Sequence, residues 1–320
     1  MKNRDSFRGT SINETFAATF KKSRFYKDIY AKHKDEIIIG VRDGFINLYY
    51  NCDSIAKIDT HNPSICRINK YYTHGEKECL TGDEIVHYFD IIKESSDKRT
   101  KLEKQAQQRL FIDNNNNLSS EWFCLDVEYT KSLQGKLHAE DWRFDIIAIS
   151  KEKPFRVALI ELKYGSGAIG GESGITKHIQ DYYKFHKENS FELLKPELIS
   201  IINSLKMLGV EVPKTLQSIK IEDFMKAPEY YFITLSNKKV GRHALPMETM
   251  AGYLFTKAEA ETNGDWKAIR YSKNASKKGY YATVGEDKSF KPIFFFSDAT
   301  LPELGINDIL YEGNYVKKNV

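Results

Sequence analysis

Two acidic residues and one lysine stand inside neighbouring apolar segments of this chain. Asp145 interrupts the apolar run 142–149, and Glu161 and Lys163 lie near the end of the run 155–163. A charged side chain in such a run is costly unless it is paired or bound to a metal ion. Two carboxylates beside an ammonium group can hold a hard divalent cation and activate a water molecule. These three residues are therefore the first candidates for catalysis.

The two apolar segments have the length and composition of β-strands. They are separated by the polar link 150–154, which ends in Pro154, as expected of a turn. Side chains alternate between the two faces of a strand, so Glu161 and Lys163 are expected to point the same way. If the two strands pair as a hairpin, Asp145 can converge on that face.

Asp145, followed by Glu161-Leu162-Lys163, resembles the signature of the PD-(D/E)XK nuclease superfamily. That superfamily contains restriction endonucleases, Holliday-junction resolvases and DNA-repair nucleases. The resemblance covers about residues 97–190, and Phe144 stands where the usual motif has proline. It implies an α/β fold with a restriction-endonuclease-like mixed central sheet flanked by helices.

The resemblance also implies a mechanism. Asp145 and Glu161 would ligate Mg²⁺ or Mn²⁺, with the Leu162 carbonyl as a third ligand, and the ion would lower the pKa of a bound water. Lys163 would orient that water and stabilise the transition state, in an electrostatic role, because nearby carboxylates favour its charged form. Replacing Glu161 with alanine is expected to leave the fold intact. The alternative is a surface hairpin with an ordinary Glu–Lys pair, worth roughly 0–1 kcal/mol.

A further acidic ligand is expected on the helix that precedes these strands. Superfamily members often bring such a residue to the metal, and Glu103 in the segment 101–108 resembles it. An exposed helical glutamate is the alternative interpretation. Asp126 and Glu128, on the first strand after that helix, are the other candidates.

The helix after Lys163 offers two polar candidates. Many superfamily members carry a glutamine there, which Gln180 would match. The helical repeat of about 100° per residue predicts one buried stripe. The stripe consists of Ile175, Ile179, Tyr182 and His186. Because His178 flanks this stripe and Gln180 turns toward solvent, His178 is preferred as a contact to phosphate or metal-bound water, with simple packing beside Tyr182 as the alternative.

Two further segments could contact phosphate groups. The glycine-rich residues 165–174 precede a helix, where backbone N–H groups can bind an anion. They lack the ending of a P-loop, so nucleotide hydrolysis is not expected. Residues 270–281 interleave basic and aromatic side chains, which suits backbone phosphates and base stacking, although a solvated charge run is the alternative. The cations predicted to bind nucleic acid there are Arg270, Lys273, Lys277 and Lys278.

Composition is compatible with a globular protein that binds nucleic acid. The chain has 320 residues, of which 41% are hydrophobic and 29% charged, and its net charge of +4 is mildly basic. No apolar run approaches the roughly 20 residues needed to span a bilayer, and no signal-peptide pattern follows the first residues, so a cytoplasmic protein is expected. The four cysteines form no CxxC pair and are expected to be free thiols.

Three regions are predicted along the chain. Residues 1–94 form an N-terminal β-rich meander with a hairpin turn at Asp43-Gly44. Residues 95–235 form the nuclease-like core, in the order helix, three strands, helix, then helices near 191–208 and 214–226 and a further strand of the same sheet. Residues 236–320 are a C-terminal elaboration.

The function expected from these features is a metal-dependent nuclease, either restriction-like or repair-like, that hydrolyses phosphodiester bonds in DNA. A homodimer is among its expected assemblies. One alternative is a catalytically inactive nuclease-fold module that binds nucleic acid or protein. The other is a phosphate-binding module built on the glycine-rich segment.

Overall fold

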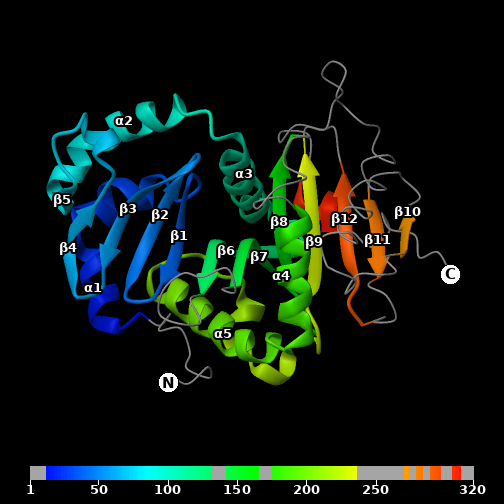
Figure 1. Cartoon of the computed structure of the whole chain (residues 1–320). Helices are drawn as coiled ribbons and strands as arrows, with labels where there is room; N and C mark the ends of the chain where they lie inside the picture. The colour runs from blue at the N-terminus through cyan, green and yellow to red at the C-terminus, as the bar shows by residue number, and fades with distance from the viewer. Residues whose placement is uncertain are drawn as a thin grey trace, which may run out of the picture. The chain divides into compact units, whose positions relative to one another are not determined.

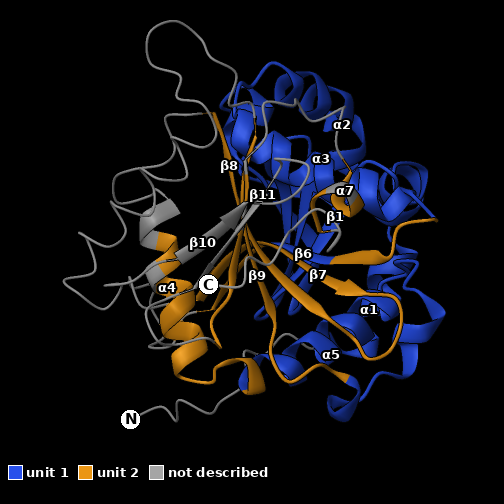
Figure 2. Cartoon of the chain, turned by 90° about the vertical axis from the view of Figure 1, so that its right-hand side faces the viewer, with its two compact units in different colours: residues 1–118, 125–127, 193–223 blue, residues 119–124, 128–192, 224–320 orange. Residues whose placement is uncertain are grey.

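The structure, a computed structural model, describes residues 12–131, 142–165, 175–235, 270–273, 279–283, 289–296 and 305–310. The described chain contains two β-sheets together with α-helices (Figure 1), so the predicted mixed α/β class is confirmed. It divides into two compact units (Figure 2). The first comprises residues 1–118, 125–127 and 193–223, and the second comprises residues 119–124, 128–192 and 224–320. The unit boundaries therefore differ from residues 94 and 235, since the chain crosses between the units several times.

The first unit contains a five-stranded sheet in the order β1-β2-β3-β4-β5, with all neighbours antiparallel. Its strands are β1 (Ile37–Arg42), β2 (Phe45–Tyr50), β3 (Asp53–Asp59), β4 (Asn62–Arg67) and β5 (Cys79–Thr81). Isoleucine and valine dominate β1, as their branched side chains favour strands. The turn between β1 and β2 needs a positive φ, which Gly44 adopts at 74°. The predicted meander is confirmed.

The first unit also contains α-helices. Among those described, α3 (Leu102–Asn116) and most of α5 (Phe191–Met207) were predicted, whereas α1 (Glu14–Lys22) and α2 (Gly82–Asp97) were not. Thr81 caps α2 by accepting from the backbone of Glu84, whose side chain accepts from the Thr81 backbone in return. This Thr-x-x-Glu capping box was the available sequence signal for α2. The helix expected around residues 101–108 is present as α3, whereas α2 was not predicted.

The helical spacing of Leu102, Ala106, Arg109 and Leu110 predicts one buried face of α3, which is confirmed in part. Ala106 and Leu110 are buried, whereas Leu102 is 52% exposed and Arg109 is exposed. The buried side chains are Ala106, Gln107, Gln108, Leu110, Phe111 and Asn114. Half of these are amides, so hydropathy alone does not identify the buried face of this helix.

The second sheet has seven strands in the order β10-β11-β12-β9-β8-β7-β6. They are β6 (Trp122–Lys131), β7 (Trp142–Ser150), β8 (Val157–Tyr164), β9 (Glu229–Leu235), β10 (Arg270–Lys273), β11 (Gly279–Thr283) and β12 (Pro292–Phe296). Strand β8 pairs antiparallel with β7 and parallel with β9, which in turn pairs parallel with β12. The sheet is therefore mixed, as predicted, and strands from the C-terminal region extend it.

The elements around the candidate residues follow the predicted order. The chain runs α3, β6, β7, β8 and then α4 (Ile175–Lys187), with the short helix α7 (Ile306–Leu310) near its end. The predicted helix near 214–226 is wrong. That segment holds only the 3₁₀ turns Lys214–Ser218 and Ile221–Asp223, because Ile219 between them is extended with ψ 140°.

The hairpin of β7 and β8 forms the centre of the second unit's core. Ile146, Ile147, Ile160 and Leu162 are fully buried. Burial of each such side chain contributes about 1.5–3 kcal/mol relative to its exposure. The charged residues of this hairpin therefore stand on a rigid support. Among the helices in the described ranges, none is long and apolar enough to cross a membrane.

Candidate active site

Asp145 and Glu161 come from two strands that pair directly. Strands β7 and β8 form an antiparallel ladder from Ile146↔Ile160 to Ile149↔Val157, so the predicted hairpin is present. Beyond that ladder, the backbone amide of Leu162 donates a hydrogen bond of 2.8 Å to Asp145 Oδ2. The Asp145 carboxylate thus lies against the β8 backbone, at the residue next to Glu161.

Glu161 and Lys163 form a buried ion pair. Glu161 Oε1 lies 2.7 Å from Lys163 Nζ. Only 1% of Glu161 and 6% of Lys163 are exposed. The two residues point the same way from β8, as strand alternation predicted. The alternative interpretation, a surface ion pair, is therefore wrong. In the low-dielectric interior, the carboxylate and the ammonium group offset part of each other's cost of burial.

His178 completes this cluster from helix α4. Its Nε2 lies 3.1 Å from Glu161 Oε1, and 18% of its side chain is exposed. His178 was preferred as a residue of this site, and it does contact Glu161 directly. The partner expected from the sequence was phosphate or metal-bound water. The side chain of Gln180 lies outside the described part of the structure. We name Glu161, Lys163, His178 and Asp145 the carboxylate cluster.

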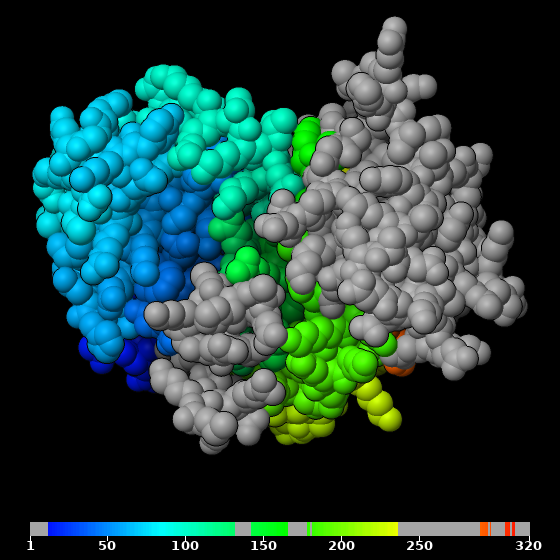
Figure 3. Space-filling model, in the orientation of Figure 1, coloured from blue at the N-terminus to red at the C-terminus, as the bar shows by residue number. Residues whose placement is uncertain are grey.

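The buried stripe of α4 differs from the predicted one at its C-terminal end. Ile179 and Tyr182 are buried as expected, whereas Phe185 is buried in place of His186. Phe185 makes edge contacts with Trp142 and Phe144 of β7, at ring distances of 4.9 and 5.3 Å. His186 is half-buried and contacts the hydroxyls of Tyr230 and Ser289. The outer face of α4 reaches the surface, as the bright green atoms in Figure 3 show.

Tyr182 lies beside the carboxylate cluster and was expected only as a core residue. It is 1% exposed, and its ring contacts those of Phe232, Phe144 and Tyr230. Burial raises the pKa of its phenol well above the ordinary value, and the carboxylates of Glu161 and Asp145 raise it further. The hydroxyl therefore keeps its proton at neutral pH.

The other acidic candidates have different surroundings. Asp126 is fully buried, and Arg42 Nη1 donates to both of its carboxylate oxygens at 2.8 Å. This pairing lies within the first unit and gives Asp126 a structural role. Glu128 adopts a φ of 53°, which departs from the extended backbone of the rest of β6. Glu103 is half-buried in the first turn of α3, in the first unit, whereas the carboxylate cluster belongs to the second.

The predicted phosphate-binding segments are described only in part. Arg270 and Lys273 mark the two ends of β10, which pairs antiparallel with β11 and is a terminal strand of the second sheet. Lys277 and Lys278 lie outside the described residues, as do residues 166–174 of the glycine-rich segment. Gly165, which precedes them, has a φ of 86° and donates its amide to the Leu235 carbonyl at 2.8 Å.

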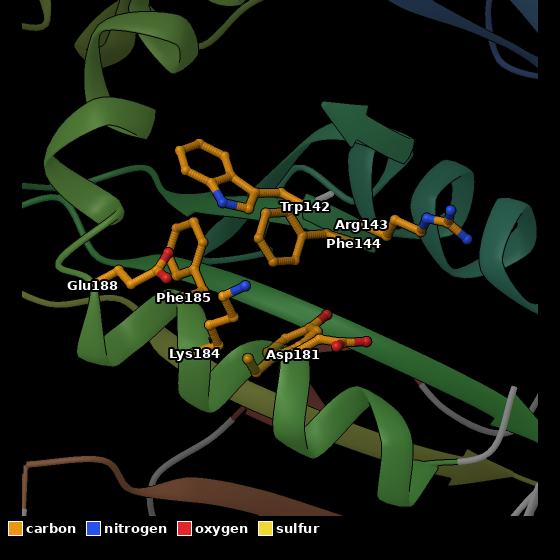
Figure 4. Close-up of a pocket in the computed structure, with 8 residues that line it drawn as sticks. Trp142, Arg143, Phe144, Asp181, Lys184, Phe185 and Glu188 are labelled. Carbon is orange, nitrogen blue, oxygen red and sulfur yellow. The ribbon is translucent and has the colours of Figure 1, made fainter. Parts of the chain in front are cut away.

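A surface hollow lies between β7 and α4 (Figure 4). Its lining consists of Trp142, Arg143, Phe144, Asp181, Tyr182, Lys184, Phe185 and Glu188. Two cations face two carboxylates in this lining, so the hollow has no net charge. Tyr182 contributes to its wall, but Asp145 and Glu161 do not. The hollow therefore does not include the two carboxylates of the candidate site.

The carboxylate cluster can supply two acidic ligands to a cation. Within the described ranges, no group of three or more His, Cys, Asp or Glu side chains is arranged to hold a metal ion. Asp145 and Glu161 nevertheless offer hard oxygen donors of the kind that Mg²⁺ prefers. Backbone carbonyls, water and a bound phosphate can supply the remaining ligands of such a cation.

Comparison with known proteins does not assign the chain to a family. No protein-family model matches the sequence, and neither the curated proteins nor the solved structures contain a significant match. The geometry of the cluster and the sequence pattern therefore carry the functional argument.

Proposed function

We propose that this protein is a metal-dependent nuclease with a restriction-endonuclease-like core, and that it hydrolyses phosphodiester bonds, with DNA as the expected substrate. The observation that carries the proposal is the buried carboxylate of Glu161, which Lys163 and His178 contact at 2.7 and 3.1 Å. Asp145 approaches the same point of β8 from the adjacent strand. Burying so many ionisable groups together is costly, and such clusters concentrate at functional sites.

The donor set fits Mg²⁺ or Mn²⁺. Mg²⁺ is usually held by one or two carboxylates, with waters and substrate phosphates completing its shell. Two carboxylates are therefore sufficient without a third acidic residue. The amide of Leu162 points toward β7, and the carbonyl of a strand residue points to the same side as its amide. The Leu162 carbonyl thus faces the side from which Asp145 approaches, as the resemblance to the nuclease superfamily requires. When bound, the ion would lower the pKa of a coordinated water.

The remaining side chains of the cluster have distinct expected roles. Lys163 holds one oxygen of Glu161 and supplies positive charge where a phosphoryl transition state accumulates negative charge. His178 contacts the same oxygen from α4, so the Glu161 carboxylate is held from two directions. A carboxylate whose orientation is held in this way loses less entropy when it binds a cation.

One observation favours a second candidate function, a catalytically inactive nuclease-fold module that binds nucleic acid or protein. Glu161 and Lys163 neutralise each other in the interior and are almost fully buried. A site of this kind can persist as a structural ion pair after activity is lost. Metal-dependent cleavage separates this candidate from the nuclease.

The test is nicking of supercoiled plasmid by the purified protein with and without Mg²⁺. We expect cleavage only with the metal, and we expect Glu161→Gln to abolish it. Glu188→Gln, at an exposed position after α4, makes the same chemical change away from the cluster and should retain activity. If the wild-type protein binds plasmid but does not nick it with Mg²⁺ or Mn²⁺, the inactive module replaces the nuclease. Equal activity of Glu161→Gln and wild type would also contradict the proposal.

A further inference from the structure

The Tyr182 hydroxyl is a buried polar group without a hydrogen-bond partner among the described residues. The residue is 1% exposed, so bulk solvent does not satisfy it. More than about 90% of buried polar groups in folded proteins have a partner, and leaving one unsatisfied costs about 1–3 kcal/mol. A phenylalanine at this position would keep the ring contacts and avoid that cost. The hydroxyl therefore calls for an explanation beyond packing.

The ring of Tyr182 lies next to the register partner of Glu161. Tyr182 packs 4.9 Å from the ring of Phe232, which is the register partner of Glu161 on the adjacent strand β9. Long side chains in a helix lean toward its N-terminus. Tyr182 therefore extends toward His178, one turn earlier on α4, and His178 contacts Glu161.

The hydroxyl is suited to donate a hydrogen bond. A tyrosine phenol has an ordinary pKa of about 10, so the hydroxyl carries its proton at neutral pH and can donate it in a hydrogen bond. A phosphodiester group is too large to reach an atom buried to this extent. A water molecule at the carboxylates is small enough and offers the acceptor that the phenol requires.

We propose that Tyr182 is a positioning residue whose hydroxyl donates a hydrogen bond to the water activated at the Asp145–Glu161 site. The inference rests on the proposed nuclease function and extends it to a residue outside the superfamily pattern given above. The hydrogen bond would orient a lone pair of the water toward the phosphorus atom, leaving the transfer of its proton to other groups. It also accounts for retaining a buried hydroxyl among aromatic rings.

The test combines the activity of the variant Tyr182→Phe with a fluorine NMR measurement at Tyr182. Loss of a partner in the outer shell of a metal site typically lowers activity by about 10–100-fold, and we expect a loss of that size in kcat with little change in KM. The fold and the affinity for Mn²⁺ should stay close to wild type. Tyr183→Phe removes a hydroxyl from the next residue of α4 and serves as the matched control.

Fluorine NMR of protein labelled with 3-fluorotyrosine gives a readout that packing alone does not change. The resonance missing from Tyr182→Phe identifies Tyr182, and we expect it to shift when Mg²⁺ is added to wild type but not to Glu161→Gln. If Mn²⁺ titration shows no binding to wild type, the proposed function fails and this inference fails with it. If the metal binds and plasmid is nicked, yet the resonance is unchanged and Tyr182→Phe keeps full kcat, only the role of Tyr182 is overturned.

Discussion

The carboxylate of Glu161 compensates the buried positive charge of Lys163. Replacing Glu161 with alanine should therefore lower the stability of the protein. The sequence interpretation expected an intact fold after Glu161→Ala. In the structure, however, Glu161 compensates Lys163, which is only 6% exposed. We expect Glu161→Ala to destabilise the protein by about 3–5 kcal/mol, because it removes the carboxylate 2.7 Å from the buried ammonium of Lys163. Urea denaturation followed by circular dichroism measures this, and the double variant Glu161→Ala/Lys163→Met should recover part of the loss. Equal stability of the single variant and wild type would contradict the burial argument.

His178 and Gln180 provide a contrast on the same helix. His178 contacts the catalytic candidate Glu161, so His178→Ala should lower the cleavage rate by roughly 10²–10⁴-fold, the range for a positioned polar or proton-transfer group. Gln180→Ala should change the rate little. Initial rates of plasmid nicking at saturating Mg²⁺ measure both effects. A larger loss for Gln180→Ala would show that the superfamily's helical glutamine, and not His178, serves the site.

The cysteines differ in their reactivity because they differ in burial. All four are free, as predicted, and Cys79 is exposed whereas Cys52, Cys66 and Cys124 are buried. Burial raises the pKa of Cys66 to about 12, so almost no reactive thiolate forms there at neutral pH. A chromogenic disulfide reagent should therefore modify one thiol rapidly in the native protein and the other three only after denaturation. The fast phase should vanish in Cys79→Ser, and its persistence would contradict the assignment.

At the scale of elements, an ion pair joins strands β1 and β6 within the first unit. Arg42 donates to both oxygens of Asp126 and also to the Tyr49 hydroxyl at 3.0 Å, and all these groups are buried. Breaking a buried pair leaves an uncompensated charge, so Arg42→Met should cost about 3–5 kcal/mol. Guanidinium denaturation measures the loss. Arg24→Met, at an exposed ion pair with Asp28, is the control and should change stability by less than about 1 kcal/mol.

Helix α4 packs on the core of the second unit with one face, and it places His178 of the candidate site on the flank of that face. Ile179, Tyr182 and Phe185 face the sheet, and His178 reaches Glu161 from the flank of that face. The packing of aromatic rings against β7 and β9 therefore sets the position of the histidine. A substitution that shifts this helix would change the site without touching a charged residue.

At the scale of the whole molecule, nucleic-acid binding should depend on salt. The net charge of +4 is small, so under the proposed function local clusters of cations would supply most contacts to phosphates. If Lys277 and Lys278 each contact one phosphate, their double alanine variant should reduce the slope of log K against log[salt] by about 2. Fluorescence anisotropy of labelled duplex DNA measures this slope. The variant Lys21→Ala/Lys22→Ala, at exposed positions of α1, removes the same amount of charge. It should leave the slope of log K against log[salt] unchanged. Equal slopes for the two variants would contradict a specific role for Lys277 and Lys278.

Local patterns in the sequence determined much of the secondary structure. The apolar runs at β1, β2, β7, β8 and β9 mark strands because burial and β-branched side chains act within a few residues. The alternation of side chains along β8 placed Glu161 and Lys163 on one face, because this alternation follows from the local geometry of an extended backbone. The capping box at Thr81 and Glu84 was equally local and marked the start of α2.

Tertiary structure decided how deeply the charged residues are buried and which groups they contact. Arg42 and Asp126 are 84 residues apart, and only the packing of β1 and β6 brings them together. Gln107 and Gln108 are buried although they are polar. The elements that pack against α3, and not the hydropathy of α3 itself, determine which face of this helix is buried. His178 meets Glu161 because the aromatic residues of α4 dock on the sheet at one rotation of the helix. Contacts of this kind depend on the sum of many distant packing interactions, and no short segment of the sequence contains that information.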